Sequence, residues 1–318
     1  RKMVLPFTLQ QLRIIKAVAT ELSFTKASEI LFISQPSLSK QLKILENRLG
    51  VQLINRHKNH ISLTEAGQLL IQYSERILSL CEESCRALND LKIGERGVLR
   101  IGTTQNLATY FIPNILVLFN KNYPQINLKV QIEPSKLIIN QVINHSIDIA
   151  VLEDYVPTFL KKKLHIENII DEELYLIVSN SYSLKSNKKK IINKVDLYDL
   201  NFIGFNNDST IRKFIDNILI QNNIKIKELN ITMELNSLEA IKTAVSLGLG
   251  VAFVSSLAVK NEIELKTLEI IQIENIKLSY PIYLITNPDY NRSKAFELFY
   301  TQLLTSKNII KKLKPNNI

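Results

Sequence analysis

The sequence predicts an amino-terminal winged helix-turn-helix domain, mainly α-helical, followed by a long linker helix and a two-lobed α/β domain. Three observations predict this order. Residues 8–64 have the pattern of three short helices, a glycine stop and a basic hairpin. Residues 64–91 repeat apolar positions at alternating steps of three and four, which is typical of a helix that pairs with another helix. From residue 98 onward, strand-like and helix-like segments alternate, which favours parallel α/β structure.

Length and composition limit the class of protein. With 318 residues, of which 46% are hydrophobic, the chain is long enough for two or three domains with their own cores. Forty Lys and Arg residues against 30 Asp and Glu give a formal net charge of +10, which favours polyanionic partners. No run of about 18 apolar residues predicts a membrane span, and the first residues do not resemble a signal peptide. Two cysteines without a secretory signal predict a reducing compartment.

Breaks in these patterns divide the chain into five segments. We expect a winged helix-turn-helix domain over 6–63, a dimerisation helix over 64–91, a hinge over 92–97, a ligand-binding domain over 98–305 and a polar tail over 306–318. The ligand-binding domain is expected to interleave its lobes, with lobe 1 at about 98–170 and 275–305 and lobe 2 at about 171–274.

Capping residues mark the first three helices. Thr8 and Gln11 fit a capping box, and apolar residues then follow at helical spacing. Thr25 is expected to cap a second helix over 26–31. Ser34 is expected to cap a third helix, in which Pro36 is tolerated because the first turn has no amide partner to lose. Gly50 supplies the left-handed stop.

The third helix has one apolar and one polar face. Its leucines 38, 42, 45 and 49 fall on one stripe, which leaves polar residues on the other side. Amides and hydroxyls can pair with base edges, and lysines can meet guanine or phosphate. The alternative is a merely solvated face, but the preceding helix and turn favour a helix-turn-helix that places this helix in the major groove of DNA. The candidate DNA-binding residues within 24–43 are Thr25, Lys26, Ser34, Gln35, Pro36, Ser37, Ser39, Lys40 and Lys43.

The hairpin after Gly50 is basic. Arg56, His57, Lys58 and His60 lie at or near its tip, which suits the phosphate backbone or the minor groove. Arg56 and Lys58 are therefore further candidates for DNA contact. A metal site is disfavoured because no cysteine or carboxylate lies near the two histidines.

The same segment resembles the LysR-type transcriptional regulators. The resemblance lies in the run Phe24-Thr25-Lys26-Ala27-Ser28, in the run from Ile33 to Glu46, and in Leu49-Gly50, Arg56 and Leu63-Thr64-Glu65-Ala66-Gly67. It departs from the family pattern at Ser28, where alanine is common, and at Ile54, where phenylalanine is usual. The resemblance implies DNA contacts at Gln35, Ser37, Ser39, Lys40, Lys43 and Arg56. It also implies a periplasmic-binding-protein-like effector domain in the second half.

The helix expected from Thr64 to about Leu91 carries a seam with a spacing of 3.5. A seam of this kind predicts a coiled coil with a second copy, and a two-fold dimer would present two recognition helices to two half-sites. The alternative is packing against the chain's own body. Cys81 and Cys85 lie near this seam, where thiols are more often inert than redox-sensing. The seam residues are Leu70, Tyr73, Ile77, Leu80, Ser84, Ala87 and Leu91.

The second half contains two stretches of similar sequence. Glu133-Pro134-Ser135, a helix and Ile149-Ala150-Val151 recur about 102 residues later as Leu235-Asn236-Ser237, a helix and Val251-Ala252-Phe253. Two related lobes would face each other across a ligand cleft, although chance likeness of two strand-helix-strand units is an alternative. The other expected segments include a strand over 98–102, a helix over 107–120 and a last helix over 293–304.

Polar residues at strand ends and helix starts predict the walls of the cleft. Thr103, Thr104 and Gln105 follow a strand and precede a helix, where a helix amino terminus favours an anionic ligand. Helix capping alone also explains Thr104, Ser209 and Ser237. Resemblance to the LysR family places effector contacts at Thr103, Thr104, Gln105, Asn206, Ser209 and Ser237.

The expected function is a transcription factor controlled by a small-molecule effector, with double-stranded DNA and a second copy of itself as partners. An enzyme on a two-lobed scaffold is disfavoured, since the chain has four His and two Cys and lacks GxSxG, CxxC and phosphate-loop motifs. An architectural DNA-binding protein without a sensor is a further alternative. No cofactor or metal is expected, and dimer and tetramer both stay open.

A branch within the family is also indicated. Phe111-Ile112-Pro113 after Thr103-Thr104-Gln105 resembles the regulators of the RuBisCO operon in autotrophic bacteria and plastids. The frequent Ile, Asn and Lys residues have AT-rich codons, which fits a plastid genome, or else an AT-rich bacterium. We therefore expect the chloroplast stroma, or otherwise a bacterial cytoplasm.

Overall fold

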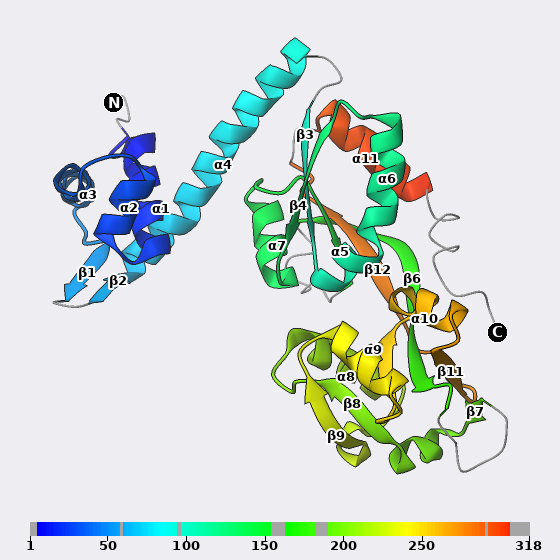
Figure 1. The fold of residues 1–318 in the computed structure, drawn as a ribbon. Coiled ribbons are helices and arrows are strands. Elements are labelled where there is room, and N and C mark those ends of the chain that lie inside the picture. The colour runs from blue at the N-terminus through cyan, green and yellow to red at the C-terminus, as the bar shows by residue number, and fades with distance from the viewer. Residues whose placement is uncertain are drawn as a thin grey trace. The chain divides into compact units, whose positions relative to one another are not determined.

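The computed structural model describes residues 5–57, 60–93, 97–153, 163–181, 190–289 and 292–305. The chain divides into two compact units (Figure 1). The first comprises the helices and strands up to Ile93, and the second comprises those that follow. Among the described residues, no helix is long and apolar enough to cross a membrane.

The first unit has the predicted order of helices and a hairpin. Three helices pack around a core that includes Ile15, Val18, Leu38 and Leu42, all fully buried. The two strands of the hairpin are antiparallel. The elements are α1 (Leu9–Glu21), α2 (Phe24–Ile30), α3 (Gln35–Leu49), β1 (Ile54–His57), β2 (His60–Leu63) and α4 (Glu65–Ile93).

The helix ends follow the capping chemistry, with one correction. The Thr8–Gln11 capping box forms, the Ser34 hydroxyl accepts from the amide of Ser37, and Gly50 ends α3 at φ 70°. The prediction that Thr25 caps the second helix was wrong. Ser23 has the extended backbone of a cap and accepts from the amide of Lys26, so α2 begins at Phe24.

The hairpin is fixed to the helices by three backbone contacts. The Glu46 carboxylate on α3 accepts hydrogen bonds from the amides of Leu53 (2.9 Å) and Ile54 (3.3 Å). At the start of α4, the Thr64 hydroxyl donates to the Gln52 carbonyl oxygen at 2.7 Å. Gly67 packs so close that an added Cβ would lie 2.1 Å from the Leu53 carbonyl oxygen. The wing is therefore held in a fixed position beside α3.

The second unit has two lobes. Lobe 1 contains β3 (Val98–Thr103), α5 (Gln105–Tyr110), α6 (Ile112–Asn122), β4 (Asn127–Ile132), α7 (Ser135–Ile143), β5 (Ile149–Leu152), β12 (Ser279–Thr286) and α11 (Lys294–Thr305). Lobe 2 contains β7 (Ile191–Ile192), η2 (Lys194–Asp199), β8 (Asn201–Phe205), α8 (Thr210–Gln221), η3 (Ile226–Glu228), β9 (Asn230–Leu235), α9 (Leu238–Ser246), β10 (Ala252–Ser255), η4 (Ser256–Ala258), α10 (Lys260–Glu264) and β11 (Leu268–Ile273).

One long strand, β6 (His165–Ser179), belongs to both lobes (Figure 1). Its first part pairs with β12 from His165 to Glu173, and its last part pairs with β10 and β11 from Leu174 to Ser179. In lobe 1 the strand order runs β4-β3-β5-β12-β6. The expected interleaving of the chain between lobes follows from this crossing.

Two details differ from the sequence prediction. The strands are not all parallel. The strands β3, β4 and β5 are parallel to one another, β8 is parallel to β9, and β11 is parallel to β7. By contrast, β12, β10 and β11 all run antiparallel to β6, and β12 also runs antiparallel to β5. The expected helix over 107–120 is broken at Phe111, whose φ and ψ are −107° and −59°. Pro113 starts α6 there, because proline lacks the amide that would continue α5.

The two stretches of similar sequence in the second half have similar structures. β4, α7 and β5 form a strand-helix-strand unit in lobe 1, and β9, α9 and β10 form the corresponding unit in lobe 2. In both strand-helix-strand motifs every residue of the last strand is buried. The amino termini of α7 and α9 lie next to one cavity, so residues of both motifs line it.

Candidate functional site

The first candidate site is the polar face of α3. Gln35, Pro36, Ser37, Lys40 and Lys43 are exposed, as is the cap residue Ser34, and Ser39 is half-buried. The opposite stripe of Leu38, Leu42 and Leu45 is fully buried. The predicted division of this helix is thus present: one face builds the core, and the other is free to contact a ligand.

The start of α2 extends this face. Thr25 and Lys26 are exposed, and the Thr25 hydroxyl donates to the Gln35 side-chain oxygen at 3.4 Å. That contact brings the first turns of two helices together. The Arg56 backbone lies in β1, but its side chain and all of Lys58 fall outside the described residues.

The second candidate site is a cleft of about 590 Å³ between the lobes of the second unit, a volume typical of small-molecule sites. Lobe 1 contributes Thr104, Gln105, Asn106 and Tyr110 among others, and lobe 2 contributes Ser237. Apolar side chains also line it, namely Ile132, Pro134, Leu174, Phe205, Ile211, Phe214, Ile215, Leu238 and Val254.

Six effector-binding residues were predicted from the sequence. Three of them line the cleft, namely Thr104, Gln105 and Ser237. Thr103 does not, because it is fully buried and its hydroxyl donates to the Val151 carbonyl oxygen at 2.8 Å.

Asn206 and Ser209 also lie outside the described lining. The Ser209 hydroxyl donates to the Asn206 carbonyl oxygen and accepts from the amide of Arg212, so it caps α8. The aromatic rings of Phe205 and Phe214 form the wall that these two polar residues were expected to form.

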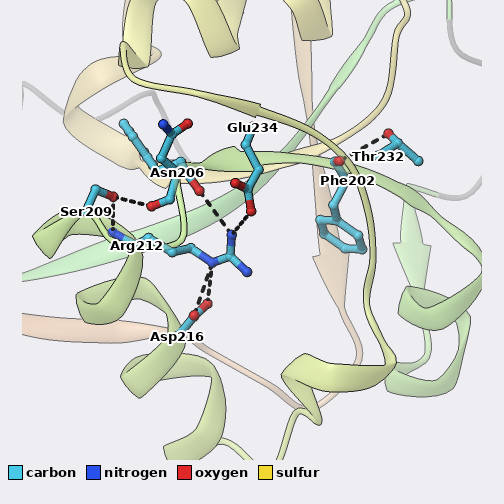
Figure 2. A network of polar contacts seen from close by, with 8 residues as sticks. Phe202, Asn206, Ser209, Arg212, Asp216, Thr232 and Glu234 are labelled. Atoms are coloured by element: carbon cyan, nitrogen blue, oxygen red, sulfur yellow. Dashed lines mark hydrogen bonds and ion pairs between the residues drawn. The ribbon is translucent and has the colours of Figure 1, made fainter.

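A buried arginine supports that wall (Figure 2). Arg212 on α8 donates through Nη1 to the Phe205 carbonyl oxygen at 3.0 Å and through Nε to Asp216 at 2.9 Å. It also approaches Glu234 on β9 at 3.5 Å. With both carboxylates and a carbonyl around it, this guanidinium joins α8, β8 and β9 and is not directed at the cleft.

The floor of the cleft carries buried carboxylates. Glu153, at the end of β5, accepts from the Thr104 hydroxyl at 2.6 Å. Deeper, Glu172 on β6 accepts from Ser255, Ser256 and the amide of Leu257 at 3.0, 2.7 and 3.0 Å. Burial and these two carboxylates raise the pKa of Tyr280 well above its ordinary value.

Tyr110 and Glu239 bridge the lobes at the cleft. The Tyr110 hydroxyl on α5 donates a hydrogen bond to the Glu239 carboxylate on α9. The ammonium group of Lys242 lies 2.9 Å from Glu239 and 5.2 Å from the centre of the Tyr110 ring. Lys242 is itself buried and also bonds the Ala258 carbonyl oxygen and Glu262. We call Tyr110, Glu239 and Lys242 the inter-lobe latch.

The charges around the cleft are uneven. Among the described residues that line it are three carboxylates, Glu133, Glu153 and Glu239, and no Lys, Arg or His. The nearby cations Lys242 and Arg212 are each held by two carboxylates. An anion in this cleft would therefore be held by amides and hydroxyls at the helix starts, not by a basic side chain.

The predicted seam residues on α4 differ in their exposure to solvent. Tyr73 and Leu80 are 54% and 57% exposed, and Ser84 is exposed too. Ile77 is half-buried, and Leu70 packs against the core of the first unit. The side chains of Ala87 and Leu91 fall outside the described residues. Leu69 and Leu88, which the seam prediction omitted, are exposed and add to the apolar surface of the helix.

Neither cysteine forms a disulfide: Cys81 is half-buried and Cys85 exposed. Within the part of the chain that the structure describes, no three His, Cys, Asp or Glu residues gather as a metal site requires.

Comparison with known proteins identifies the family of both parts of the chain. Residues 9–68 match the model of the bacterial regulatory helix-turn-helix protein, lysR family, and residues 92–307 match the LysR substrate binding domain. A "Probable RuBisCO transcriptional regulator" of Thalassiosira pseudonana is 61% identical, covering 96% of this chain and all of the relative. One of the same description from Gracilaria tenuistipitata var. liui is 45% identical, covering 95% and 97%.

Solved structures share the fold. CbnR, a LysR family transcriptional regulator, superposes with a TM-score of 0.67 at 20% identity, covering 95% of this chain and 99% of that one. Full-length CbnR in complex with its target DNA gives 0.68 at 22% identity, covering 94% and 100%.

The inter-lobe latch should respond to acid. Burial tends to raise the pKa of Glu239, but the hydrogen bond from Tyr110 and the hydrogen bond and charge of Lys242 outweigh burial, so the pKa lies below the ordinary value of a glutamate. A lowered pKa stabilises the folded state at neutral pH, and this stabilisation is lost as the pH falls through the pKa of Glu239. Tyr110→Phe should shift the Glu239 pKa upward in a carboxylate NMR titration. An unchanged titration would show that the latch does not form.

Proposed function

We propose that this chain, which belongs to the LysR family of transcriptional regulators, reads promoter DNA as a dimer or tetramer and controls RuBisCO genes in response to a small molecule. The observation that carries the DNA-reading part is the exposed start of α3, joined to the start of α2 through Thr25 and Gln35. In a helix-turn-helix these first turns face the major groove.

The polar residues divide between two tasks. Gln35, Ser37 and Ser39 present amide and hydroxyl groups that can pair with base edges. Lys26, Lys40 and Lys43 are exposed cations that can neutralise phosphates or meet guanine. Ser34 and Pro36 set the start of the helix. Arg56 and Lys58 of the wing are proposed to contact the phosphate backbone or the minor groove.

Self-association through α4 is supported by its exposed apolar residues. Tyr73 and Leu80 are seven residues apart and so lie on one face of the helix. Large apolar side chains that are more than half exposed on one helix face favour burial against a second copy. A two-fold pair would match a promoter with two half-sites.

The cleft between the lobes is the proposed effector site. Thr104, Gln105 and Ser237 supply polar groups at helix starts, while Phe205 and Phe214 supply an apolar wall. An effector that contacts both lobes changes the relative population of lobe placements, and a ligand shifts such an equilibrium only through its differential contacts. An anionic metabolite would meet the Glu133 and Glu153 carboxylates, so its charge would have to lie against α5, α7 or α9.

The target and compartment come from the relatives. The relatives described as probable RuBisCO transcriptional regulators include diatom and red algal proteins and share 43–61% identity with this chain. We therefore propose RuBisCO genes as targets and the plastid stroma as the compartment. Footprinting on a RuBisCO promoter and on the gene's own upstream region tests this proposal, and no protected site on either would contradict it.

The two alternatives are less favourable. An architectural protein has no use for a second half that matches the LysR substrate binding domain from residue 92 to residue 307. The family is one of regulators, not enzymes.

Substitutions on α3 should weaken DNA binding in two different ways. Gln35→Ala should cost about 1–3 kcal/mol at the protected promoter and relax base preference at one position. Lys40→Ala should weaken all sequences alike and reduce the slope of log affinity against log salt by about 1. Lys16→Ala on α1 removes an equal, exposed charge elsewhere and is the control. Wild-type binding by both α3 variants would refute the groove assignment.

Charges placed in the α4 surface should separate the copies. Tyr73→Glu combined with Leu80→Glu buries two carboxylates in the proposed apolar interface, so sedimentation should show monomers. Affinity for a two-half-site promoter should fall about 10²-fold or more, since joint binding is lost. Gln72→Glu adds a charge a quarter turn away on the helix and should keep the oligomer. A monomeric wild-type protein would contradict the proposal.

Filling the cleft should abolish the response to an effector. A thermal-shift screen of phosphorylated sugars, carboxylates and nucleotides identifies ligands, and Ile132→Trp, in the cleft lining, should remove their shift while leaving ligand-free DNA binding intact. Val117→Trp adds the same ring at an exposed site of lobe 1 outside the cleft lining and should keep the shift. Equal shifts in both variants would place the ligand elsewhere.

A further inference from the structure

A chain of hydrogen bonds joins the start of α1 to the middle of α3. In the capping box of α1, the backbone amide of Gln11 donates to the Thr8 hydroxyl at 3.2 Å, and the backbone amide of Thr8 donates to Gln11 Oε1 at 3.0 Å. Gln11 Nε2 then donates to Gln41 Oε1 on α3 at 3.2 Å. Gln11 is buried, so its side chain is held between the two helices by hydrogen bonds at both ends of its amide.

This chain fixes the direction in which both side-chain amides point. The backbone amide of Thr8 can only donate, so the Gln11 atom that faces it must be the oxygen. The other end of the Gln11 amide is then the NH₂ group, which can also only donate, so the Gln41 atom that faces it must be an oxygen too. The NH₂ group of Gln41 is therefore directed away from Gln11. One backbone N–H of the capping box thus sets the orientation of a side chain on α3.

The NH₂ group of Gln41 faces solvent. Its side chain is half-buried, and among the described residues no group accepts a hydrogen bond from its Nε2. This nitrogen is also absent from the buried polar atoms that lack a partner, so it is open to solvent. A side chain that is anchored through its oxygen therefore presents two N–H donors in a fixed position.

Gln41 lies on a flank of the DNA face of α3. Residues four apart are neighbours on a helix surface, so Gln41 lies one turn beyond Ser37, and Arg48 lies seven residues further along the same flank. An α-helix is about 10–12 Å across and the major groove is about 12 Å wide. When one face of such a helix meets the base edges, its flanks therefore meet the sugar–phosphate walls of the groove.

The outward group of Gln41 suits a phosphate better than a base. Phosphate oxygens only accept hydrogen bonds, whereas base edges present both donors and acceptors. We propose that Gln41 donates to a phosphate oxygen of promoter DNA, and that Gln11 is the positioning residue that turns the Gln41 NH₂ group outward. The proposal rests on the proposed DNA-reading function. It adds a contact that fixes the register of α3 in the groove and carries no sequence preference of its own.

Two substitutions test the two roles separately. Gln41→Glu keeps an oxygen that accepts from Gln11 Nε2 but replaces the outward donor by an anion, so affinity should fall about tenfold, by the same factor for every duplex. Gln11→Glu keeps the acceptor for the Thr8 amide but can no longer donate to Gln41. The Gln41 amide should then turn its NH₂ group inward, and affinity should fall about fivefold although α3 is unchanged.

The control is Gln72→Glu, which makes the same change of charge at an exposed position of α4 and should bind within about twofold of wild type. Thermal unfolding shows whether each variant is folded. If the carboxylate introduced by Gln11→Glu is too deeply buried for the protein to fold, Gln41→Glu alone decides the proposal.

Neutral methylphosphonates, placed one at a time in the footprinted promoter fragment, identify the phosphate. Wild type should lose about fivefold in affinity at the phosphate that Gln41 contacts, because the hydrogen bond is weakened there. Gln41→Glu should bind that modified fragment at least as well as the unmodified one, because the repulsion is removed. Phosphates contacted by lysines should cost both proteins the same factor.

Three results would overturn the proposal. They are wild-type affinity of folded Gln41→Glu, a loss in that variant that is confined to one base sequence, and equal methylphosphonate losses in both proteins at every position. Wild-type affinity of a folded Gln11→Glu variant would refute the positioning role of Gln11. Failure of the wild type to protect any promoter fragment would instead refute the proposed function, and it is seen before any variant is made.

Discussion

The second unit depends on the antiparallel pairing of β6 with its neighbours. This strand is part of both lobes, because it pairs with β12 at one end and with β10 and β11 at the other. Glu172 lies where the partners change and is fully buried. One of its carboxylate oxygens, Oε1, accepts three hydrogen bonds from the end of β10 and the segment that follows it. These bonds offset part of the cost of burying the carboxylate. The floor of the cleft and the hinge between its walls are thus the same piece of backbone.

The sequence predicted the DNA-reading unit well because its signals are local. A capping hydroxyl, a proline in the first turn and a left-handed glycine each act within a few residues. The start and end of α3 could therefore be predicted from the sequence alone. The one error, at Thr25, arose because two hydroxyl residues separated by Phe24 are both able to cap a helix. Ser23 is the cap, and Thr25 lies inside the first turn, where its side chain contacts Gln35.

The cleft was predicted less completely because its lining depends on long-range packing. Sequence reasoning favours polar residues, yet a threonine at the end of a strand can turn inward, as Thr103 does to bond Val151. The sequence did not predict that Phe205 and Phe214 line the cleft. Apolar residues in a strand or on an amphipathic helix are normally assigned to the hydrophobic core. The latch between Tyr110 and Glu239 joins residues 129 positions apart, and only the fold brings them together.

The two sites make opposite electrostatic demands on one chain. The formal charge of +10 attracts DNA, whereas the cleft gathers three carboxylates and engages its nearby cations in ion pairs. The net charge of the whole chain therefore does not describe the cleft, whose charge is set by the residues that line it. Selectivity in the cleft must come from short-range contacts. At Glu239, an occupant of the cleft that donates to the carboxylate would compete with the hydroxyl of Tyr110, and such competition would couple occupancy to the contact between the lobes.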